Sequence, residues 1–262
     1  MNKPLIYTLF VSVILISGCV STVNPVDPAD ITISVAPIEM KEFQEKEIPV
    51  NVMNNATSPI DSVSVKQIES FTVISGGNVN IPAKVNGPSS LMINARIAAP
   101  GFKDVENTSM LTLSYDSGKD NKGNPITKTK SVPVQATVLP DAKLQFVGFV
   151  KNLNSTTEAE VTTWEARAGD NVTITFSVKN DGKTTIDENS LKVIVDVDNK
   201  RMGTNNSLII RNAMAKAGTS NTLAVQIQVP KDAPNGETDV YVTLLMNEKI
   251  IDSKTIKLRV KL

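Results

Sequence analysis

The sequence predicts an all-β protein made of two tandem antiparallel β-sandwiches that follow a short apolar N-terminal segment. Three observations predict this fold class. From residue 31 to the C-terminus, apolar and polar residues alternate in short runs, which is the pattern of half-buried strands. Gly, Pro, Asn and Asp interrupt these runs about every ten residues, as turns do in sandwiches. No stretch shows the apolar period of about 3.6 residues that marks an amphipathic helix.

The N-terminal segment has the composition of a lipoprotein signal peptide. Lys3 supplies a positive charge, and residues 5–16 form an apolar run that falls short of the roughly 20 residues needed to span a membrane. The run ends in Ile16-Ser17-Gly18-Cys19, which resembles a lipobox, where small residues precede an acylated cysteine. We therefore expect residues 1–18 to be a signal peptide, Cys19 to carry the lipid and residues 19–30 to form a tether. An uncleaved signal anchor with an incidental cysteine is the alternative.

Composition argues against catalysis and against nucleic-acid binding. Lys and Arg together number 27, as do Asp and Glu, so the formal net charge is zero and no polybasic patch follows the anchor. The chain has no His, and Cys19 is its single Cys, so it lacks a disulfide and the common general bases and zinc ligand sets. We therefore expect a non-enzyme without a metal or another cofactor.

The first sandwich is expected over residues 31–140. Each of its seven candidate strands places a row of apolar residues on one face. The strands are expected at residues 31–35, 47–54, 62–66, 71–74, 91–98, 109–116 and 126–139. Pro133 lies inside the last of these and indicates an edge strand or a bulge, because proline cannot donate to a central ladder.

The second sandwich is expected over residues 143–262, after the short, stiff linker Pro140-Asp141-Ala142. Its clearest strand covers residues 171–180, where Val172, Ile174, Phe176 and Val178 share one face. The other strands are expected at residues 144–151, 160–164, 191–197, 208–210, 223–229, 240–246 and 256–262.

The opening of this second region resembles a known family. Ala168-Gly169-Asp170-Asn171-Val172-Thr173-Ile174, followed by Val178-Lys179-Asn180-Asp181-Gly182, is similar to the start of CARDB-type immunoglobulin-like domains of bacterial and archaeal surface proteins. The segment from Val229 to Glu237 also resembles one that precedes a strand in such modules. The first region matches only in layout, because Val52-Met53-Asn54-Asn55 lacks the glycine. The resemblance implies an immunoglobulin-like fold, an extracellular location and a binding or spacing role, and it transfers no catalytic residue.

Two acidic groups are candidate cation sites. Residues 116–125, DSGKDNKGNP, carry spaced acids, but Gly118, Lys119 and Lys122 interrupt the spacing that a calcium loop needs. The segment therefore favours a solvated hairpin loop. Asp196 and Asp198 lie on the outward face of a strand, where carboxylates more often keep a sheet soluble than bind a metal.

Two further features have both a functional and a structural interpretation. Lys257, Arg259 and Lys261 form a basic stripe, which suits an anionic glycan or lipid headgroup but more often protects an edge strand from pairing. Trp164, the single Trp, suits a carbohydrate platform but more often packs in a sandwich core.

Sequons that permit N-glycosylation outside the cell occur at five asparagines, at about the frequency that chance gives. They are Asn55, Asn107, Asn154, Asn171 and Asn205.

Together these features predict a prokaryotic surface lipoprotein, bacterial or archaeal, anchored in the cell membrane on its extracellular or periplasmic face. Its expected role is non-catalytic binding, adhesion or envelope scaffolding, with a protein or glycan partner. One alternative is an accessory subunit of a membrane-bound transport or secretion complex. Another is a carboxylate-based glycan hydrolase, which needs two carboxylates about 5–10 Å apart in a cleft.

The end of the second sandwich farthest from the anchor is the expected contact surface. A sandwich with an odd number of strands has its termini at opposite ends, so loops 166–170, 198–206 and 230–236 should meet at the distal tip. The middle loop offers Lys200, Arg201, Met202 and Asn205, a mixed set suited to a protein or glycan surface. The loop at residues 116–125 should point back toward the membrane.

Overall fold

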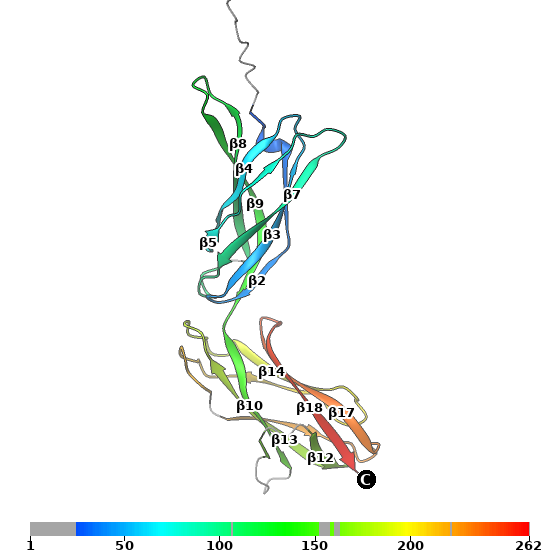
Figure 1. The fold of residues 1–262 in the computed structure, drawn as a ribbon. Coiled ribbons are helices and arrows are strands. Elements are labelled where there is room, and N and C mark those ends of the chain that lie inside the picture. The colour runs from blue at the N-terminus through cyan, green and yellow to red at the C-terminus, as the bar shows by residue number, and fades with distance from the viewer. Residues whose placement is uncertain (1–24, 106, 152–157, 160–162, 221, 262) are drawn as a thin grey trace, which may run out of the picture.

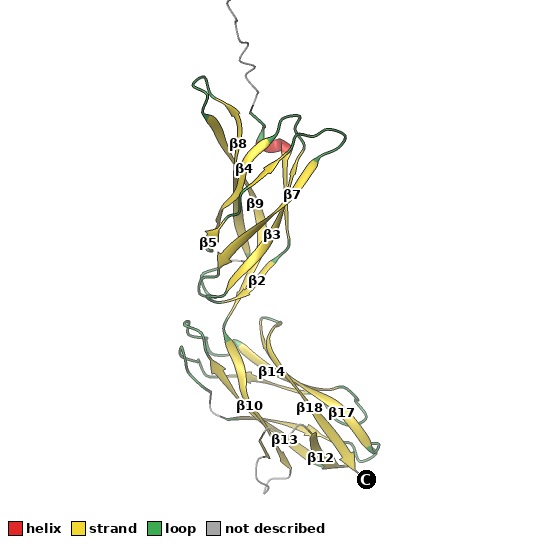
Figure 2. Ribbon diagram, in the orientation of Figure 1, coloured by secondary structure: helices red, strands yellow, loops and turns green. Residues whose placement is uncertain are grey.

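A computed structural model describes residues 25–105, 107–151, 158–159, 163–220 and 222–261. The described chain consists of β-strands joined by loops, with a single short 3-10 helix, η1 (Pro28–Asp30), near its start (Figures 1 and 2). The predicted all-β class is confirmed. Within these ranges, no helix has the length and hydropathy that crossing a bilayer requires.

The N-terminal half contains two packed sheets. One has the strand order β1-β3-β7-β5 and the other β2-β9-β8-β4-β6. The strands are β1 (Ile31–Val35), β2 (Ile38–Lys41), β3 (Glu45–Asn54), β4 (Ile60–Ile68), β5 (Thr72–Ser75), β6 (Val79–Ile81), β7 (Ser89–Ala98), β8 (Thr108–Lys119) and β9 (Pro125–Leu139).

The C-terminal half also contains two sheets, with the orders β11-β10-β13-β16 and β12-β18-β17-β14-β15. Its strands are β10 (Ala142–Lys151), β11 (Glu158–Ala159), β12 (Thr163–Arg167), β13 (Asn171–Asn180), β14 (Leu191–Val197), β15 (Asn206–Ile210), β16 (Leu223–Gln228), β17 (Gly236–Met246) and β18 (Lys249–Lys261). Figure 1 shows this half below the first, with the C-terminus far from the start of the described chain.

The five-stranded sheets of the two halves share one topology, whereas the smaller sheets differ in one edge strand, β5 beside β7 in the first half and β11 beside β10 in the second. Each half has one five-stranded sheet that begins with a parallel pair, β2 with β9 and β12 with β18, and continues antiparallel. Each also has its own cluster of buried apolar side chains. Independent folding of the two halves stays a prediction.

The predicted inward rows form these cores. Val172, Ile174, Phe176 and Val178 are all fully buried, and so is the row from Leu191 to Val197. The alternation is visible because each strand has one face on the core and the other in solvent. Sequence reasoning missed the short strands β2, β6 and β11, and residues 160–162 of an expected strand lie outside the described residues.

Pro133 lies where β9 is a local edge. Met110 of β8 is its partner on one side, whereas β2 pairs only with residues 136–139 of β9 on the other. The proline therefore interrupts no described ladder on the β2 side, in agreement with the edge interpretation.

A buried asparagine closes the same strand end in both halves. Asn54 and Asn180 are 0% exposed, and their Oδ1 atoms accept from the amides of Ala56 and Gly182. Asn54 Nδ2 donates to Ser58 O at 2.8 Å and Pro82 O at 3.0 Å. Asn180 Nδ2 donates to Thr184 O at 2.9 Å and Ala215 O at 3.2 Å. Each side chain thus supplies partners for loop backbone groups that would otherwise be buried unpaired.

Gly182, the glycine that the motif of the first half lacks, lies at the contact between the two halves. A Cβ at Gly182 would lie 1.6 Å from Oε1 of the buried Glu42, so no larger residue fits there without movement. Ala56 takes this position in the first half. The motif itself therefore tolerates a side chain, and the neighbouring half is what requires glycine at residue 182.

Polar contacts join the two halves around the linker. Among the described residues, three ion pairs cross between them: Lys41 with Asp141 at 3.1 Å, Lys103 with Asp187 at 2.6 Å and Lys249 with Glu39 at 2.9 Å. All are partly exposed, and such pairs contribute little stability each. They favour one arrangement of the two halves, whereas the stability of each half depends on its own apolar core.

The start of the described chain is fastened to β8. Val26 is buried, its amide donates to Ser117 Oγ at 2.7 Å, and its carbonyl accepts from the Tyr115 hydroxyl at 3.2 Å. Burial, with Asp27 and Asp30 nearby, raises the pKa of Tyr115 to about 12. Val26 is therefore fixed at the end of the molecule opposite the C-terminus (Figure 1).

Candidate functional site

The three loops predicted to form the distal tip do lie together. Gly169 N donates to Pro230 O at 3.2 Å, which joins the first loop to the third. Thr204 N donates to Gln228 O at 3.1 Å, and Asp198 N donates to Asp239 O at 2.9 Å. These bonds tie the middle loop to the ends of β16 and β17. The cluster lies at the C-terminal end of β18, far from residue 25 (Figure 1).

Most of the proposed contact side chains hold this loop in shape. Lys200 Nζ binds the Asp196 carboxylate, and it donates to Asn205 Oδ1 at 3.0 Å. Asn205 Oδ1 also accepts from Val197 N at 2.9 Å. Met202 is 2% exposed and belongs to the core. Direct contact with a partner at this site stays a prediction, and of the four residues only Arg201 presents a side chain without a described bond.

The exposed face of the distal loops carries charges of both signs. Arg201 and Lys231 are exposed, and neither side chain makes an ion pair or hydrogen bond within the described ranges. Gly169, with a φ of +87°, lets the first loop pass close to Lys231: a Cβ there would lie 3.5 Å from Lys231 Cγ. A partner surface facing these loops would meet these two cations and Arg167, together with the exposed acids Asp198 and Asp232.

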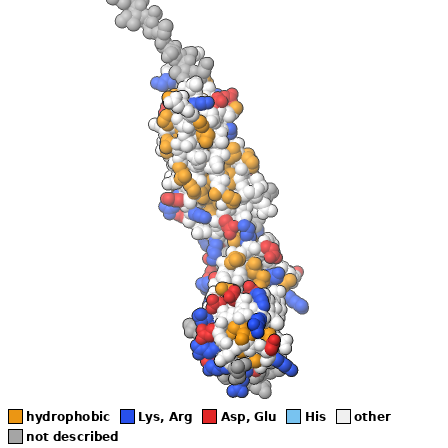
Figure 3. Space-filling view, turned by 90° about the vertical axis from the view of Figure 1, so that its right-hand side faces the viewer, with side chains coloured by type: hydrophobic (Ala, Val, Ile, Leu, Met, Phe, Trp, Pro, Cys, Tyr) orange, Lys and Arg blue, Asp and Glu red, His pale blue; other side chains and the backbone are white. Residues whose placement is uncertain are grey.

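The basic stripe is neutralised within its own sheet. Lys257 lies 3.5 Å from Asp239, Lys261 lies 2.7 Å from Glu165, and Arg259 binds both Glu165 and Glu237. Lys261 and then Arg259 hold the pKa of Glu165 below its usual range. The edge-strand interpretation is wrong, because β18 lies between β12 and β17. Figure 3 shows acidic and basic side chains interspersed over the C-terminal half.

Trp164 is a core residue. It is 1% exposed, on β12 beside Leu258 of β18, which agrees with the packing interpretation and leaves no face for a carbohydrate.

The two acidic groups serve local structure. Asp196 pairs with Lys200, while Asp198 is exposed. In the hairpin between β8 and β9, Asp120 accepts from Asn124 N at 2.9 Å and Lys122 N at 2.8 Å. Hydrogen bonds from the backbone and side chain of Asn124, then from Lys122 and Gly123, lower the pKa of Asp120. The carboxylate is thus used by its own turn, as a solvated hairpin requires.

No group of three or more potential metal-ligating side chains is assembled in the described part of the chain. The hairpin points toward the end at which the described chain begins, as predicted (Figure 1).

The modification sites fall into different environments. Asn107 and Asn171 are exposed. Asn55 Nδ2 donates to Asp30 O at 3.0 Å, and the Asn205 side chain is engaged as described above. Cys19 and Asn154 lie outside the described residues. Glycosylation and lipidation both stay predictions.

Comparison with known proteins gives structural likenesses at low sequence identity. No protein-family model matches the chain, and no curated protein matches it either. Among solved structures it is similar to a red sea bream transglutaminase, with a TM-score of 0.40, 11% identity, and coverage of 89% of this chain and 31% of that one. It is also similar to a Porphyromonas gingivalis protein of unknown function, with a TM-score of 0.26, 13% identity, and coverage of 89% and 100%. It is similar as well to the YadV chaperone, with a TM-score of 0.27, 11% identity, and coverage of 87% of this chain and 100% of that one.

Proposed function

We propose that this protein is a lipid-anchored, non-catalytic binding module on the outer face of a prokaryotic cell membrane. Cys19 holds the chain in the membrane, and the two β-sandwich halves carry the distal loops away from it. The role is adhesion, scaffolding of the envelope or retention of a protein or glycan partner.

The separation of the two ends of the molecule supports this proposal best. Val26 is fastened to β8 at one end by Tyr115 and Ser117. Loops 166–170, 198–206 and 230–236 meet at the other end, where Arg201 and Lys231 are exposed. Loops on a rigid scaffold are the usual place for recognition. A chain attached upstream of Val26 would present these loops to the surroundings.

The distal loops can be tested in native membranes. The tagged full chain is cross-linked there, and the recovered proteins and glycans are quantified by mass spectrometry. We expect reversal of both distal charges, Arg201→Glu with Lys231→Glu, to weaken recovery of the specific partner about tenfold, because two attractions become repulsions.

The matched control is Lys119→Glu with Lys122→Glu, which makes the same change of charge on the hairpin that faces the membrane. Recovery should be unchanged for this pair. A loss with the hairpin pair and none with the distal pair would reverse the orientation proposed here.

A further inference from the structure

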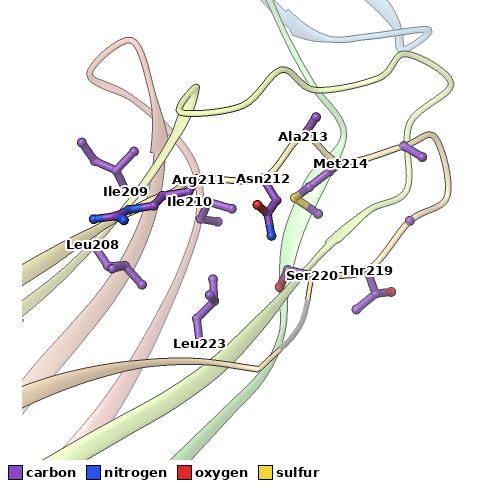
Figure 4. A pocket seen from close by; sticks show the side chains of 12 residues that line it. Leu208, Ile209, Ile210, Arg211, Asn212, Ala213, Met214, Thr219, Ser220 and Leu223 are labelled. Carbon is purple, nitrogen blue, oxygen red and sulfur yellow. The ribbon is translucent and has the colours of Figure 1, made fainter.

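The C-terminal half has an open seam between its two sheets. β15 and β16 are the outer strands of opposing sheets, and Asn206 Nδ2 bridges them by donating to Gln226 O at 2.7 Å. From there the strands diverge around a cavity of about 490 Å³. Figure 4 shows Leu208 and Leu223 lining it from the two strands, with Asn212 and Met214 at its end.

The walls of this seam are fixed in place. Met214 and Ile186 exchange two backbone hydrogen bonds, at 2.8 and 2.9 Å. Asn180 Nδ2 also donates to Ala215 O, and Asn180 N donates to Gly218 O at 2.8 Å. A ligand would thus meet a largely preformed site, which lowers the ordering cost of binding.

The first half shows what closes the equivalent seam. Val50 of β3 pairs with Ile93 of β7, just as Phe176 of β13 pairs with Leu223 of β16. Ile93 is 1% exposed, whereas Leu223 is half-buried.

Backbone covers Ile93 in the first half. A Cβ at Gly77 would lie 2.5 Å from Ile93 Cγ2, and the preceding Gly76 accepts from Val65 N at 2.9 Å. The chain between β5 and β6 therefore covers Ile93 while it pairs with β4, in the place that β15 takes beside β14 in the second half. There Leu223 is left beside the cavity.

The charge around the open seam favours an acidic ligand. Lys192 and Arg211 line an adjoining hollow that shares Leu208 with the cavity. Neither cation has an ion pair or hydrogen bond from its side chain within the described ranges, and no acidic side chain is among the described residues lining the two hollows. A carboxylate brought there would find two unpaired cations.

We propose that the seam between β15 and β16 accepts an extended, acidic segment of a partner protein. Its main chain lies in the seam between β15 and β16, and an apolar side chain fills the space between Leu208 and Leu223. A neighbouring Asp or Glu pairs with Arg211 and Lys192. The addition of a strand at an exposed sheet edge is a common mode of peptide recognition. This inference names a partner class for the binding role proposed above but uses a surface separate from the distal loops.

The test uses the full chain in phospholipid nanodiscs and a displayed library of short random peptides. We expect the enriched peptides to alternate apolar and polar residues and to carry Asp or Glu. Arg211→Glu with Lys192→Glu should weaken their binding about tenfold, and added salt should weaken native binding, because exposed charges are screened.

The matched control is the distal pair, Arg201→Glu with Lys231→Glu, which should bind these peptides as the native chain does. Methyl NMR provides a second measurement without mutation: Leu208, Leu223 and Met214 should shift when a selected peptide binds. The proposal would be overturned if no acidic peptides were enriched, or if Arg211→Glu with Lys192→Glu bound the selected peptides as tightly as the native chain. It would also be overturned if octanoate saturated the seam while no peptide was enriched. None of these outcomes bears on the distal loops, so the two ideas fail separately.

Discussion

Trp164→Ala is expected to destabilise the C-terminal half by about 3–5 kcal/mol, because it removes the largest buried side chain of that core and leaves a cavity. Trp164 is 1% exposed, on β12 against β18. The loss is a large fraction of the roughly 5–15 kcal/mol that stabilises an ordinary domain. Calorimetry should show the transition of the C-terminal half at a lower temperature and that of the N-terminal half unchanged.

Trp164→Phe is the control for cavity volume. It keeps a ring in the core and should cost clearly less than the alanine variant. A Trp164→Ala protein with native stability would mean that Trp164 lies on the surface, contrary to its place in the structure.

Asn180→Ala is expected to cost about 2–4 kcal/mol, because it leaves the Gly182 amide and the carbonyls of Thr184 and Ala215 without their partner. Asn54→Ala should have a similar effect in the first half. The single Trp reports on the C-terminal half alone. Its fluorescence transition in denaturant should shift with Asn180→Ala and stay in place with Asn54→Ala, whose effect should appear in circular dichroism.

Exposed asparagines without a described side-chain bond supply the matched controls. Asn86→Ala and Asn212→Ala should each change stability by less than about 0.5 kcal/mol. If either Asn54→Ala or Asn180→Ala shifted both transitions together, the two halves would be one cooperative unit, and the two-domain prediction would be wrong.

The alternation of apolar and polar residues predicted the long strands well, because a strand with one buried face needs an apolar residue at every second position. The row Val172 to Val178 is an example. β2 and β6, strands of four and three residues, were missed because each buries at most two side chains, which gives alternation little to distinguish them from loops. β2 also lies parallel to β9 across about a hundred residues of chain, and such a pairing has no local signal.

The same limitation explains the error at the basic stripe. Lys257, Arg259 and Lys261 alternate with core residues, which correctly placed them on the outer face. Their position in the sheet depends on β12, whose parallel pairing with β18 brings Glu165 beside Arg259 and Lys261. Nothing near residue 259 in the sequence distinguishes an edge strand from a central one.

The distal site was predicted in location but not in detail. Strand counting correctly placed the three loops together. Met202 was expected on the surface because a loop is usually polar, yet the chain turns back and buries it under Gly236. The open seam left no sequence signal either. It becomes visible only when Leu223 is compared with Ile93, its counterpart in the other half.

The membrane partition of the full chain and of Cys19→Ser, both expressed in native cells, tests the central claim most directly. Two or more acyl chains, at about 0.8 kcal/mol per buried CH₂, should keep the native protein in the membrane pellet through high salt and alkaline carbonate, until detergent releases it. Cys19→Ser should appear in the wash, while Ser21→Ala, a matched neighbour, should remain bound. If Cys19→Ser stayed in the pellet as firmly as the native chain, the residues before Cys19 would be an uncleaved anchor and lipidation would be wrong.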